Sequence, residues 1–355
     1  MKTYRAAVIG CSRMGGFIDN EVRAGENIVL PYSHAAGYLA CERTDLVACA
    51  DLREDVMAEF GKAHQVPKEG QYTDYREMLA REEPDIVSVA TQPEPRAEIV
   101  VYAVEHGARA IYAEKAMAAS MEEADAMVAA VEKNGAVLNL GTNRRWDPGY
   151  DKMKEIIDSG ELGALETLII YDNSRLFNGS SHTLDLILRL NDDVPATWVQ
   201  GHLPEGDEIF AGDVLRQDPL AEGVIQFENG VKGYALLTPR RSEFEAVCTE
   251  GTLTAFNNGQ GWRVRRFGTA EYSGSPMPEY ERASSTLRLV EDLVHALDTG
   301  EPPRGGVRVA RANNELIFAF IESHRRGGAR VELPLSGSRV RLQRQHTPRQ
   351  PRYAS

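Results

Sequence analysis

Short apolar runs and amphipathic stretches alternate along the first 143 residues of the chain. Five runs rich in Val, Ile and Ala are typical of buried parallel strands; they cover 5–10, 45–51, 85–91, 108–115 and 136–143. Patterns of helical period fill or flank the intervals, at 33–42, 53–64, 74–82, 96–107 and 120–135. This alternation predicts an α/β fold with a doubly wound parallel sheet, of the Rossmann type, covered by helices on both faces.

The pattern changes after Asn143. Longer strand-like runs follow a helix at 150–163; they cover 164–173, 196–203, 222–238, 244–256 and 261–267. Asn229-Gly230 lies between two apolar runs and predicts a tight hairpin. Two late helical patterns cover 285–300 and 309–328. We expect a second α/β domain here, with a large, mostly antiparallel open sheet and helices on one face.

A chain of 355 residues exceeds the size of one ordinary core, so two domains are expected. The boundaries predicted from the pattern are 1–143 for a dinucleotide-binding domain and 144–335 for a domain that binds substrate and forms oligomers. Residues 336–355 are rich in Arg, Gln and Pro and show no apolar period. We expect this tail to be flexible, or to lie as an arm on another subunit.

Charge and composition exclude several classes of function. The net charge of −13 argues against nucleic acid and anionic membrane as partners, because both attract a cationic surface. No apolar run approaches the length needed to span a bilayer, and the start of the chain lacks the features of a signal peptide. The four cysteines show no metal-ligand spacing. These features favour a cytoplasmic protein with reduced thiols and no metal site.

The segment after the first strand is a candidate phosphate loop. Gly10 ends the strand and Gly15 takes the third glycine position of a dinucleotide fingerprint, while Ser12 replaces the second glycine. Arg13 and Met14 lie between them. Serine is small and its hydroxyl can donate to a phosphate oxygen. The alternative is a strand-to-helix turn that binds no ligand.

Asp51 ends the second strand, where a carboxylate accepts hydrogen bonds from the adenosine ribose. The same carboxylate repels a 2′-phosphate, so NAD is favoured over NADP. Arg53 lies two residues further on and is able to pair with that phosphate, which keeps NADP as an alternative. The alternative role for Asp51 is the N-cap of the next helix, and one carboxylate is able to fill both roles.

Several stretches together resemble the Gfo/Idh/MocA family of oxidoreductases. They are AVIGCSRMGG, LVACAD, VSVATQPEPRAEIVVYAVEHGARAIYAEKAMAAS and GTNRRWDPGYDKMKEIIDSGELGALETL, and the similarity extends to about Pro334. The resemblance implies a nicotinamide cofactor on the Rossmann domain. The residues implied to bind it are Gly10, Ser12, Arg13, Met14, Gly15, Asp51, Arg53, Thr91, Gln92, Pro93, Glu114, Lys115 and Asn143.

The same resemblance implies the catalytic residues. Lys115 matches the lysine that hydrogen-bonds the reacting oxygen of the substrate and helps to move its proton. His182 matches an acid–base histidine and Asp185 the aspartate after it, while Asn178 replaces a first aspartate and cannot take a proton. The alternatives are a solvated surface lysine and a helix-capping segment that leaves His182 exposed.

Three departures from the family stand out. The family's Glu-Lys-Pro motif ends here in Ala116, for which we expect a trans peptide bond or a strained one. An insertion, residues 17–32, precedes His34, the match to the family's helix-borne histidine. Two outcomes are expected for this insertion: it splits the first helix, or it forms a loop over the cofactor or substrate. Arg96 stands where the family commonly has histidine.

Arg145 and Trp146 follow the fifth strand and are candidates for substrate contact, Arg145 through its charge and Trp146 by stacking on a sugar. The alternatives are that Arg144 pairs with an acid and that Trp146 belongs to the core between the two domains.

We expect a dehydrogenase or reductase that acts on a secondary alcohol or ketone of a sugar, inositol or sugar acid. A homodimer or homotetramer built through the open sheet is expected from the resemblance. Two other functions stay open. One is a glycosidase or lyase that oxidises its substrate transiently and recycles NAD, and the other is a sensor without turnover.

Overall fold

The structure, a computed structural model, describes residues 2–22, 28–240, 242–268, 276–344 and 350–353. The chain forms two compact units. Unit 1 comprises residues 1–146, 283–311 and 346–355, and unit 2 comprises 147–282 and 312–345. The division at residue 146 lies close to the boundary expected at 143. Residues 283–311, which the sequence pattern assigned to the second domain, pack instead within unit 1.

Unit 1 contains a six-stranded parallel sheet with the order β3-β2-β1-β4-β5-β6. The strands are β1 (Tyr4–Ile9), β2 (Thr44–Ala50), β3 (Gln71–Tyr72), β4 (Ile86–Val89), β5 (Ala110–Ala113) and β6 (Val137–Leu140). This is the predicted Rossmann sheet, and its strand order reverses between β1 and β4, where such sheets bind ligands at the carboxyl edge. Only β3, two residues long, was not predicted.

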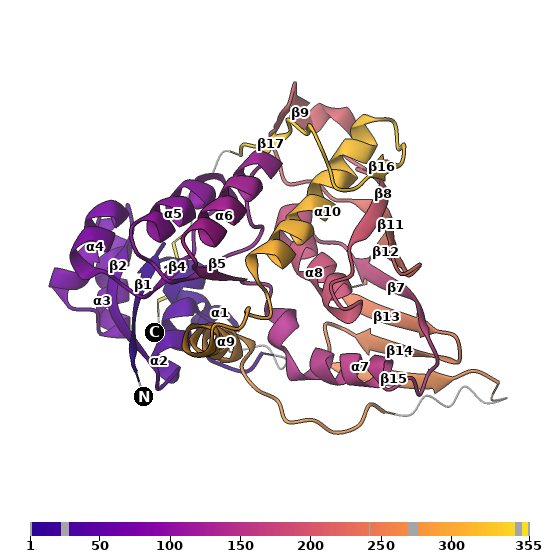
Figure 1. Ribbon diagram of the computed structural model, residues 1–355, viewed down its shortest axis with the longest axis horizontal. Helices are drawn as coiled ribbons and strands as arrows, with labels where there is room; N and C mark the ends of the chain where they lie inside the picture. Colours follow the sequence, from indigo (N-terminus) through magenta and orange to yellow (C-terminus); the bar gives the residue numbers. More distant parts are fainter. Residues whose placement is uncertain (1, 23–27, 241, 269–275, 345–349, 354–355) are drawn as a thin grey trace. The chain divides into compact units, whose positions relative to one another are not determined.

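Helices cover both faces of this sheet (Figure 1). One core cluster joins the sheet to α4 (Tyr75–Glu82), α5 (Pro93–Glu105) and α6 (Met121–Lys133). A second cluster joins the other face to α2 (His34–Ala40), α3 (Glu54–His64) and α9 (Ser285–Thr299). A short 3₁₀ turn, η2 (Lys68–Gly70), precedes β3.

The inserted residues 17–32 split the first helix. A π turn, η1 (Arg13–Phe17), runs into the short helix α1 (Ile18–Val22), and the helical path resumes only at α2. Residues 23–27 of the insertion lie outside the described residues. Ser33 caps α2 by accepting a hydrogen bond from the amide of Ala36, which starts the second piece at His34.

Asp292 on α9 connects three separate segments of unit 1. Its Oδ2 accepts hydrogen bonds from Asn139 Nδ2 at 2.8 Å, from Trp146 Nε1 at 3.3 Å and from the amide of Arg304 at 2.9 Å. Asn139 lies in β6, and Trp146 ends the 3₁₀ turn η3 (Asn143–Trp146). One carboxylate therefore attaches a helix from late in the chain to the last strand of the parallel sheet.

Unit 2 is built on an eight-stranded sheet with the order β15-β14-β13-β7-β12-β11-β8-β16. The neighbours β7 and β12 run parallel and all the other pairs are antiparallel, as the sequence pattern predicted. The strands are β7 (Leu165–Asp172), β8 (Ala196–His202), β11 (Glu222–Phe227), β12 (Lys232–Leu237), β13 (Glu243–Cys248), β14 (Gly251–Phe256), β15 (Gly261–Arg266) and β16 (Val331–Glu332). The predicted hairpin at Asn229-Gly230 joins β11 to β12.

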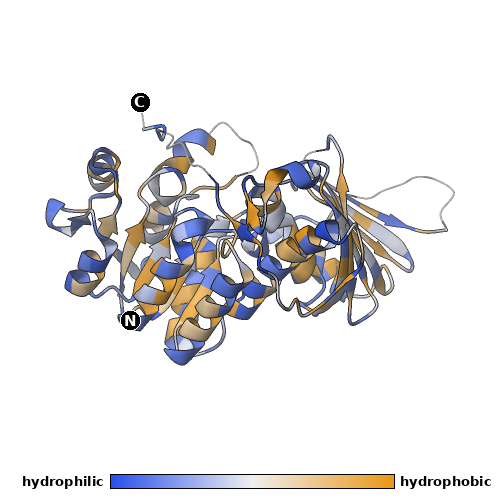
Figure 2. Ribbon diagram, turned by 90° about the horizontal axis from the view of Figure 1, so that it is seen from above, coloured by the Kyte–Doolittle hydropathy of each residue, from blue (hydrophilic) through white to orange (hydrophobic). Residues whose placement is uncertain are grey.

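Helices lie along one face of this sheet (Figure 1). They are α7 (Pro148–Asp158), α8 (Ser181–Leu190) and α10 (Val307–Arg325), with the short turns η4 (Leu176–Ser180) and η5 (Gly206–Ile209). Residues of β7, β13 and β14 alternate between buried and half-exposed, so each strand has one face in the core. Hydrophobic residues follow the strands of both sheets in Figure 2.

The segment expected to be a flexible tail contributes to unit 2. Residues Arg341–Leu342 form β17, which pairs in parallel with β10 (Val214–Leu215), and β10 pairs in turn with β9 (Phe210–Ala211). Val340 and Leu342 are fully buried. The apolar residues of this stretch alternate with polar ones, as in a strand. The alternation covers too few residues to be recognised within a polar sequence.

Among the described residues, no helix combines the length and the apolarity required to span a membrane.

Replacing Asp292 by alanine is expected to destabilise unit 1, because the amide of Asn139, the indole N–H of Trp146 and the amide of Arg304 all lose an acceptor. The midpoint of urea unfolding, followed by circular dichroism, should fall by an amount equivalent to about 2 kcal/mol. Glu291→Ala, an exposed neighbour on the same helix, is the control and should leave the midpoint unchanged. Equal midpoints for the two variants would contradict this account of α9.

Candidate functional site

The turn after β1 has the geometry of a dinucleotide-binding loop. Gly10 has a φ of +95°, which a side chain disfavours. A Cβ on Gly15 would lie 1.9 Å from the carbonyl oxygen of Gly10, so a glycine is required there as well. Ser12 precedes η1, and its hydroxyl forms no capping bond to the helix. Arg13 is exposed and pairs with Glu21, while Met14 is half-exposed.

Asp51 follows β2 and attaches the phosphate loop to it. Its Oδ2 accepts a hydrogen bond from the amide of Cys11 at 2.8 Å, and its Oδ1 accepts one from the amide of Arg53 at 2.9 Å. The N-cap of α3 is Arg53, so Asp51 is not the capping residue of that helix. Each carboxylate oxygen retains a second lone pair, which leaves acceptor capacity for ribose hydroxyls.

The loop after β4 brings Thr91, Gln92 and Pro93 to the same edge of the sheet. Thr91 Oγ1 is buried and has no hydrogen-bond partner in the described part of the chain. Gln92 is exposed and is the N-cap of α5, and Pro93 is its first residue. Arg96, which is 1% exposed, donates to the carbonyl oxygens of Thr91 and Ala116. This guanidinium therefore connects the loop after β4 to the loop after β5.

Glu114 follows β5 and is 4% exposed. Its Oε1 lies 3.1 Å from His34 Nε2, and His34 Nδ1 lies 2.9 Å from Ser88 Oγ in β4. The His34 ring stacks on Tyr112 with the centroids 3.7 Å apart. The helix that begins after the insertion is thus attached by one imidazole to the ends of two central strands.

The electrostatic surroundings of Glu114 keep it ionised. Burial alone would raise the pKa of this carboxyl, but the hydrogen bond from His34 and the charges of Lys115 and Arg96 bring the pKa down to about 2. An ionised Glu114 requires His34 Nε2 to carry a hydrogen. The other ring nitrogen, Nδ1, lies within hydrogen-bond distance of Ser88 Oγ, which is itself 2.8 Å from the hydroxyl oxygen of Tyr38.

Lys115 is half-exposed at the carboxyl end of β5, between Glu114 and the fully buried Ala116. The peptide bond between Lys115 and Ala116 is cis, so the trans bond expected as one of the two possibilities is not found. Lys115 is therefore presented from a short segment that is held on both sides, by His34 through Glu114 and by Arg96 through the carbonyl of Ala116.

Three predicted site residues lie together in η3, and all are buried. Asn143 donates from Nδ2 to Thr286 Oγ1 at 3.2 Å. Arg145, which is fully buried, donates to the carbonyl of Arg304 at 3.4 Å. Trp146 is 1% exposed and belongs to the core cluster that includes α9. Because Arg145 and the Trp146 ring are enclosed by structural contacts, we leave both out of the proposed substrate site.

The remaining predicted catalytic residues lie in unit 2, at the start of α8. Asn178 is exposed in η4, His182 is half-exposed in the first turn of α8, and Asp185 is 1% exposed. The carboxylate of Asp218 accepts hydrogen bonds from the amides of Phe177 at 2.7 Å and of Asn178 at 3.0 Å, which fixes the turn that precedes His182. Nothing in the spacing of the sequence connects Asp218 to this turn.

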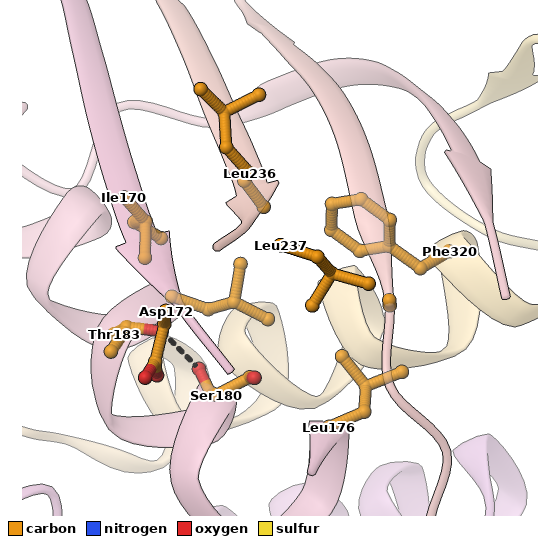
Figure 3. A pocket seen from close by; sticks show the side chains of 11 residues that line it. Ile170, Asp172, Leu176, Ser180, Thr183, Leu236, Leu237 and Phe320 are labelled. Atoms are coloured by element: carbon orange, nitrogen blue, oxygen red, sulfur yellow. Dashed lines mark hydrogen bonds between the residues drawn. The ribbon is translucent and has the colours of Figure 1, made fainter. Parts of the chain in front are cut away.

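A small pocket in unit 2 adjoins the same turn (Figure 3). Apolar residues of β7, β12, η4, α8 and α10 form most of its wall, together with Ser180 and Thr183. Asp172, the last residue of β7, also lines it and is 7% exposed. Its Oδ1 accepts hydrogen bonds from the amide of Asn173 and the hydroxyl of Ser174, whereas its buried Oδ2 has no partner among the described residues.

The residues of unit 1 fit a bound dinucleotide. The Gly10–Gly15 turn leaves no room for additional side chains, and the orphaned Thr91 hydroxyl provides a group for a ligand to bond. Asp51 lies at the end of the second strand, where the adenosine ribose binds in Rossmann folds. Within the described ranges, no group of three or more His, Cys, Asp or Glu side chains is arranged to hold a metal ion.

Comparison with known families agrees with this geometry. Residues 4–142 match the family described as "Oxidoreductase family, NAD-binding Rossmann fold", GFO_IDH_MocA. This match covers less than half of the chain. Over these residues the match confirms the resemblance inferred from the sequence, and the description of the family names NAD as the bound cofactor.

Individual relatives extend the comparison. The chain is 26% identical over 217 residues to an uncharacterized oxidoreductase of Bacillus subtilis, which covers 60% of this chain and 56% of that protein. It is 26% identical over 218 residues to myo-inositol 2-dehydrogenase of Thermotoga maritima, covering 56% of this chain and 63% of the relative. The matches thus span only about three-fifths of these curated relatives.

A solved structure of similar fold covers more of the chain. The inositol dehydrogenase homolog of Azotobacter vinelandii, complexed with NADH and myo-inositol, superimposes with a TM-score of 0.74 over 93% of this chain and 98% of that one. The sequence identity is 15%, so the likeness concerns the fold. The likeness of fold extends over both the Rossmann sheet and the large sheet of unit 2.

The depressed pKa of Glu114 predicts a pH-dependent stability. Its pKa is about 2 in the folded chain against 4.5 for an ordinary glutamate, so the stabilisation is complete above pH 4.5 and is lost as the pH falls towards 2. The full effect is at most about 3 kcal/mol. In Glu114→Gln, urea unfolding measured between these pH values should show a shallower acid decline than in the unmodified protein.

Glu105→Gln, at the exposed end of α5, is the matched control and should keep the original acid dependence. His34→Gln should weaken the stabilisation of the Glu114 carboxylate and shift the acid limb to higher pH. An unchanged acid limb in both Glu114→Gln and His34→Gln would show that the buried pair does not hold the charge.

Proposed function

We propose that this protein is an NAD-dependent dehydrogenase or reductase that acts on a secondary alcohol or ketone of a polyhydroxylated compound. The observation that carries the proposal is Lys115, a half-exposed amine at the carboxyl edge of the parallel sheet whose two neighbours are both fixed. An amine held at this place suits proton transfer to or from a substrate oxygen.

The chemistry divides between the cofactor and the chain. A bound nicotinamide supplies the acceptor or donor of hydride. Lys115 Nζ hydrogen-bonds the reacting oxygen of the substrate, and it takes the hydroxyl proton as the C–H hydrogen leaves as hydride. His182 is proposed as a second acid–base group, on a turn fixed by Asp218. Asn178 offers a hydrogen bond but no proton, so it is proposed to orient a hydroxyl.

The choice of NAD follows from Asp51. Its carboxylate follows β2 and lies against the start of the phosphate loop, where it favours ribose hydroxyls and disfavours a 2′-phosphate. A polyhydroxylated substrate is supported by two relatives: one is named myo-inositol 2-dehydrogenase, and the other is described as complexed with NADH and myo-inositol.

The function is tested by coenzyme titration and by turnover. Calorimetric titration should show binding of NADH, and a panel of inositols, sugars and sugar acids with NAD should yield net NADH for at least one substrate. Net NADH distinguishes a dehydrogenase from an enzyme that recycles its cofactor. Absence of binding with both NADH and NADPH at millimolar concentration would refute the proposal.

Lys115→Met should keep NADH binding and lose turnover by about a hundredfold or more, because the proton has no acceptor at the reacting oxygen. Lys133→Met, at the exposed end of α6, is the control and should retain full turnover. His182→Asn is tested separately, and a changed pH profile of kcat would support its acid–base role. Normal turnover in Lys115→Met would remove this lysine from the mechanism.

We also propose that two copies of the chain associate through the open face of the unit 2 sheet. Ile169 of β7 pairs with Tyr234 of β12, and Tyr171 pairs with Leu236 on the same strands. Ile169 and Tyr171 alternate with buried residues of β7, and all four side chains are only partly covered, with Leu236 38% exposed. A row of partly covered apolar side chains on a sheet face is typical of a protein interface.

Leu236→Arg is expected to reduce the oligomer to a monomer, because a charged side chain on this face cannot be buried against a second copy. Light scattering coupled to size-exclusion chromatography measures the mass. Leu39→Arg makes the same change at an exposed leucine of α2 and is expected to leave the mass unaltered. An unmodified protein that is already monomeric would contradict the proposal.

A further inference from the structure

The last described residues, 350–353, lie against unit 1. The Tyr353 ring meets Phe17 edge-on, with the ring centroids 4.8 Å apart, and packs against the core cluster that contains Phe17. Pro351 is buried. The carbonyl of Arg352 accepts a hydrogen bond from Asn20 Nδ2 at 2.9 Å. Residues 351–353 are therefore attached to the helical turn that follows the phosphate loop.

The same segment also reaches the turn between β2 and α3. Gln350 Oε1 accepts a hydrogen bond from Arg53 Nη2, and Gln350 Nε2 donates to the hydroxyl of Tyr353 at 3.0 Å. The segment thus bridges two elements, the one after β1 and the one after β2. In a Rossmann domain the adenosine half of the dinucleotide binds beside these elements.

Arg53 is held in place by this bridge. Its Nη2 pairs with Asp55 Oδ2 at 2.8 Å and its Nε with Asp55 Oδ1 at 3.3 Å, while Gln350 takes a further bond. The hydrogen bond from Arg53 lowers the pKa of Asp55, as does a smaller contribution from Gln350. The Arg53 side chain is 31% exposed, so it lies at the surface but is bonded on two sides.

This arrangement bears on the choice between the two coenzymes. An arginine near the end of the second strand is the group that accommodates a 2′-phosphate in NADP-dependent Rossmann enzymes. Here the guanidinium is engaged by Asp55 and Gln350, and the carboxylate of Asp51 remains beside the loop. A coenzyme phosphate has to compete with both partners for Arg53.

We propose that residues 350–353 are part of the adenosine-binding site and determine coenzyme choice by keeping Arg53 in its pair with Asp55. The inference rests on the proposed NAD-dependent function and deepens it. Gln350 is the selectivity residue, because its side chain bonds the arginine side chain directly. Tyr353 is the anchoring residue, because it fixes Gln350 and packs on Phe17.

The test measures binding of NADH and NADPH by calorimetry, without turnover. Three forms are compared with the unmodified protein: a chain ending at residue 349, Gln350→Ala, and Arg352→Ala. Arg352 is exposed and only its backbone carbonyl makes the bond to Asn20, so its variant is the matched control. In the shortened chain and in Gln350→Ala, the preference for NADH over NADPH should fall about tenfold. Arg352→Ala should keep the original preference.

Adding Arg53→Ala to Gln350→Ala should abolish the gain in NADPH affinity, because the released guanidinium is what binds the phosphate. An unchanged preference in Gln350→Ala and in the shortened chain, with normal NADH binding, would overturn the inference and leave the proposed function intact. Tighter binding of both coenzymes to the shortened chain would also overturn it, since the segment would then obstruct the site. If the unmodified protein binds neither coenzyme, the proposed function itself fails.

Discussion

The buried carboxylate of Glu114 is the constraint on which the centre of unit 1 depends. A charge with 4% exposure at the end of a central strand is tolerated only when hydrogen-bond donors and positive charges compensate it. His34 supplies the donor, and Arg96 and Lys115 supply the charge. To do so, His34 has to come from the helix after an insertion and Arg96 from a helix after another strand. The need to satisfy one carboxylate therefore sets the positions of two helices.

Local pattern was sufficient for most of the fold. The five apolar runs of the parallel sheet and the Asn229-Gly230 hairpin were predicted because each signal lies within a few consecutive residues. The place of α9 in unit 1 was not predicted. It depends on Asp292, whose hydrogen-bond partner Asn139 lies 153 residues away in the chain. The local sequence pattern shows the amphipathic helix but not the surface that the helix covers.

The same distinction applies to the candidate site. The phosphate loop and Asp51 follow from spacing, because the turn and the strand end are adjacent to the residues that they position. Asp218 was not predicted as a site residue, because its carboxylate bonds the backbone amides of a turn 40 residues earlier in the chain. A signal was present for Ser88: a lone hydroxyl within the apolar run of β4 needs a partner, and His34 and Tyr38 are its partners.

The departures from the family pattern become intelligible when they are considered together. Ala116 replaces a proline and Arg96 replaces a histidine, and in the structure the guanidinium of Arg96 bonds the carbonyl of Ala116. A histidine offers at most one donor in this direction, whereas the forked guanidinium reaches the carbonyls of Ala116 and Thr91 together. The two substitutions therefore act together, because the Arg96 side chain holds the backbone beside Lys115. The same logic operates after β2, where Gln350 accepts a hydrogen bond from Arg53. In both places, a contact between segments far apart in the sequence fixes a cationic side chain or the residue next to one. Local sequence patterns do not connect these segments.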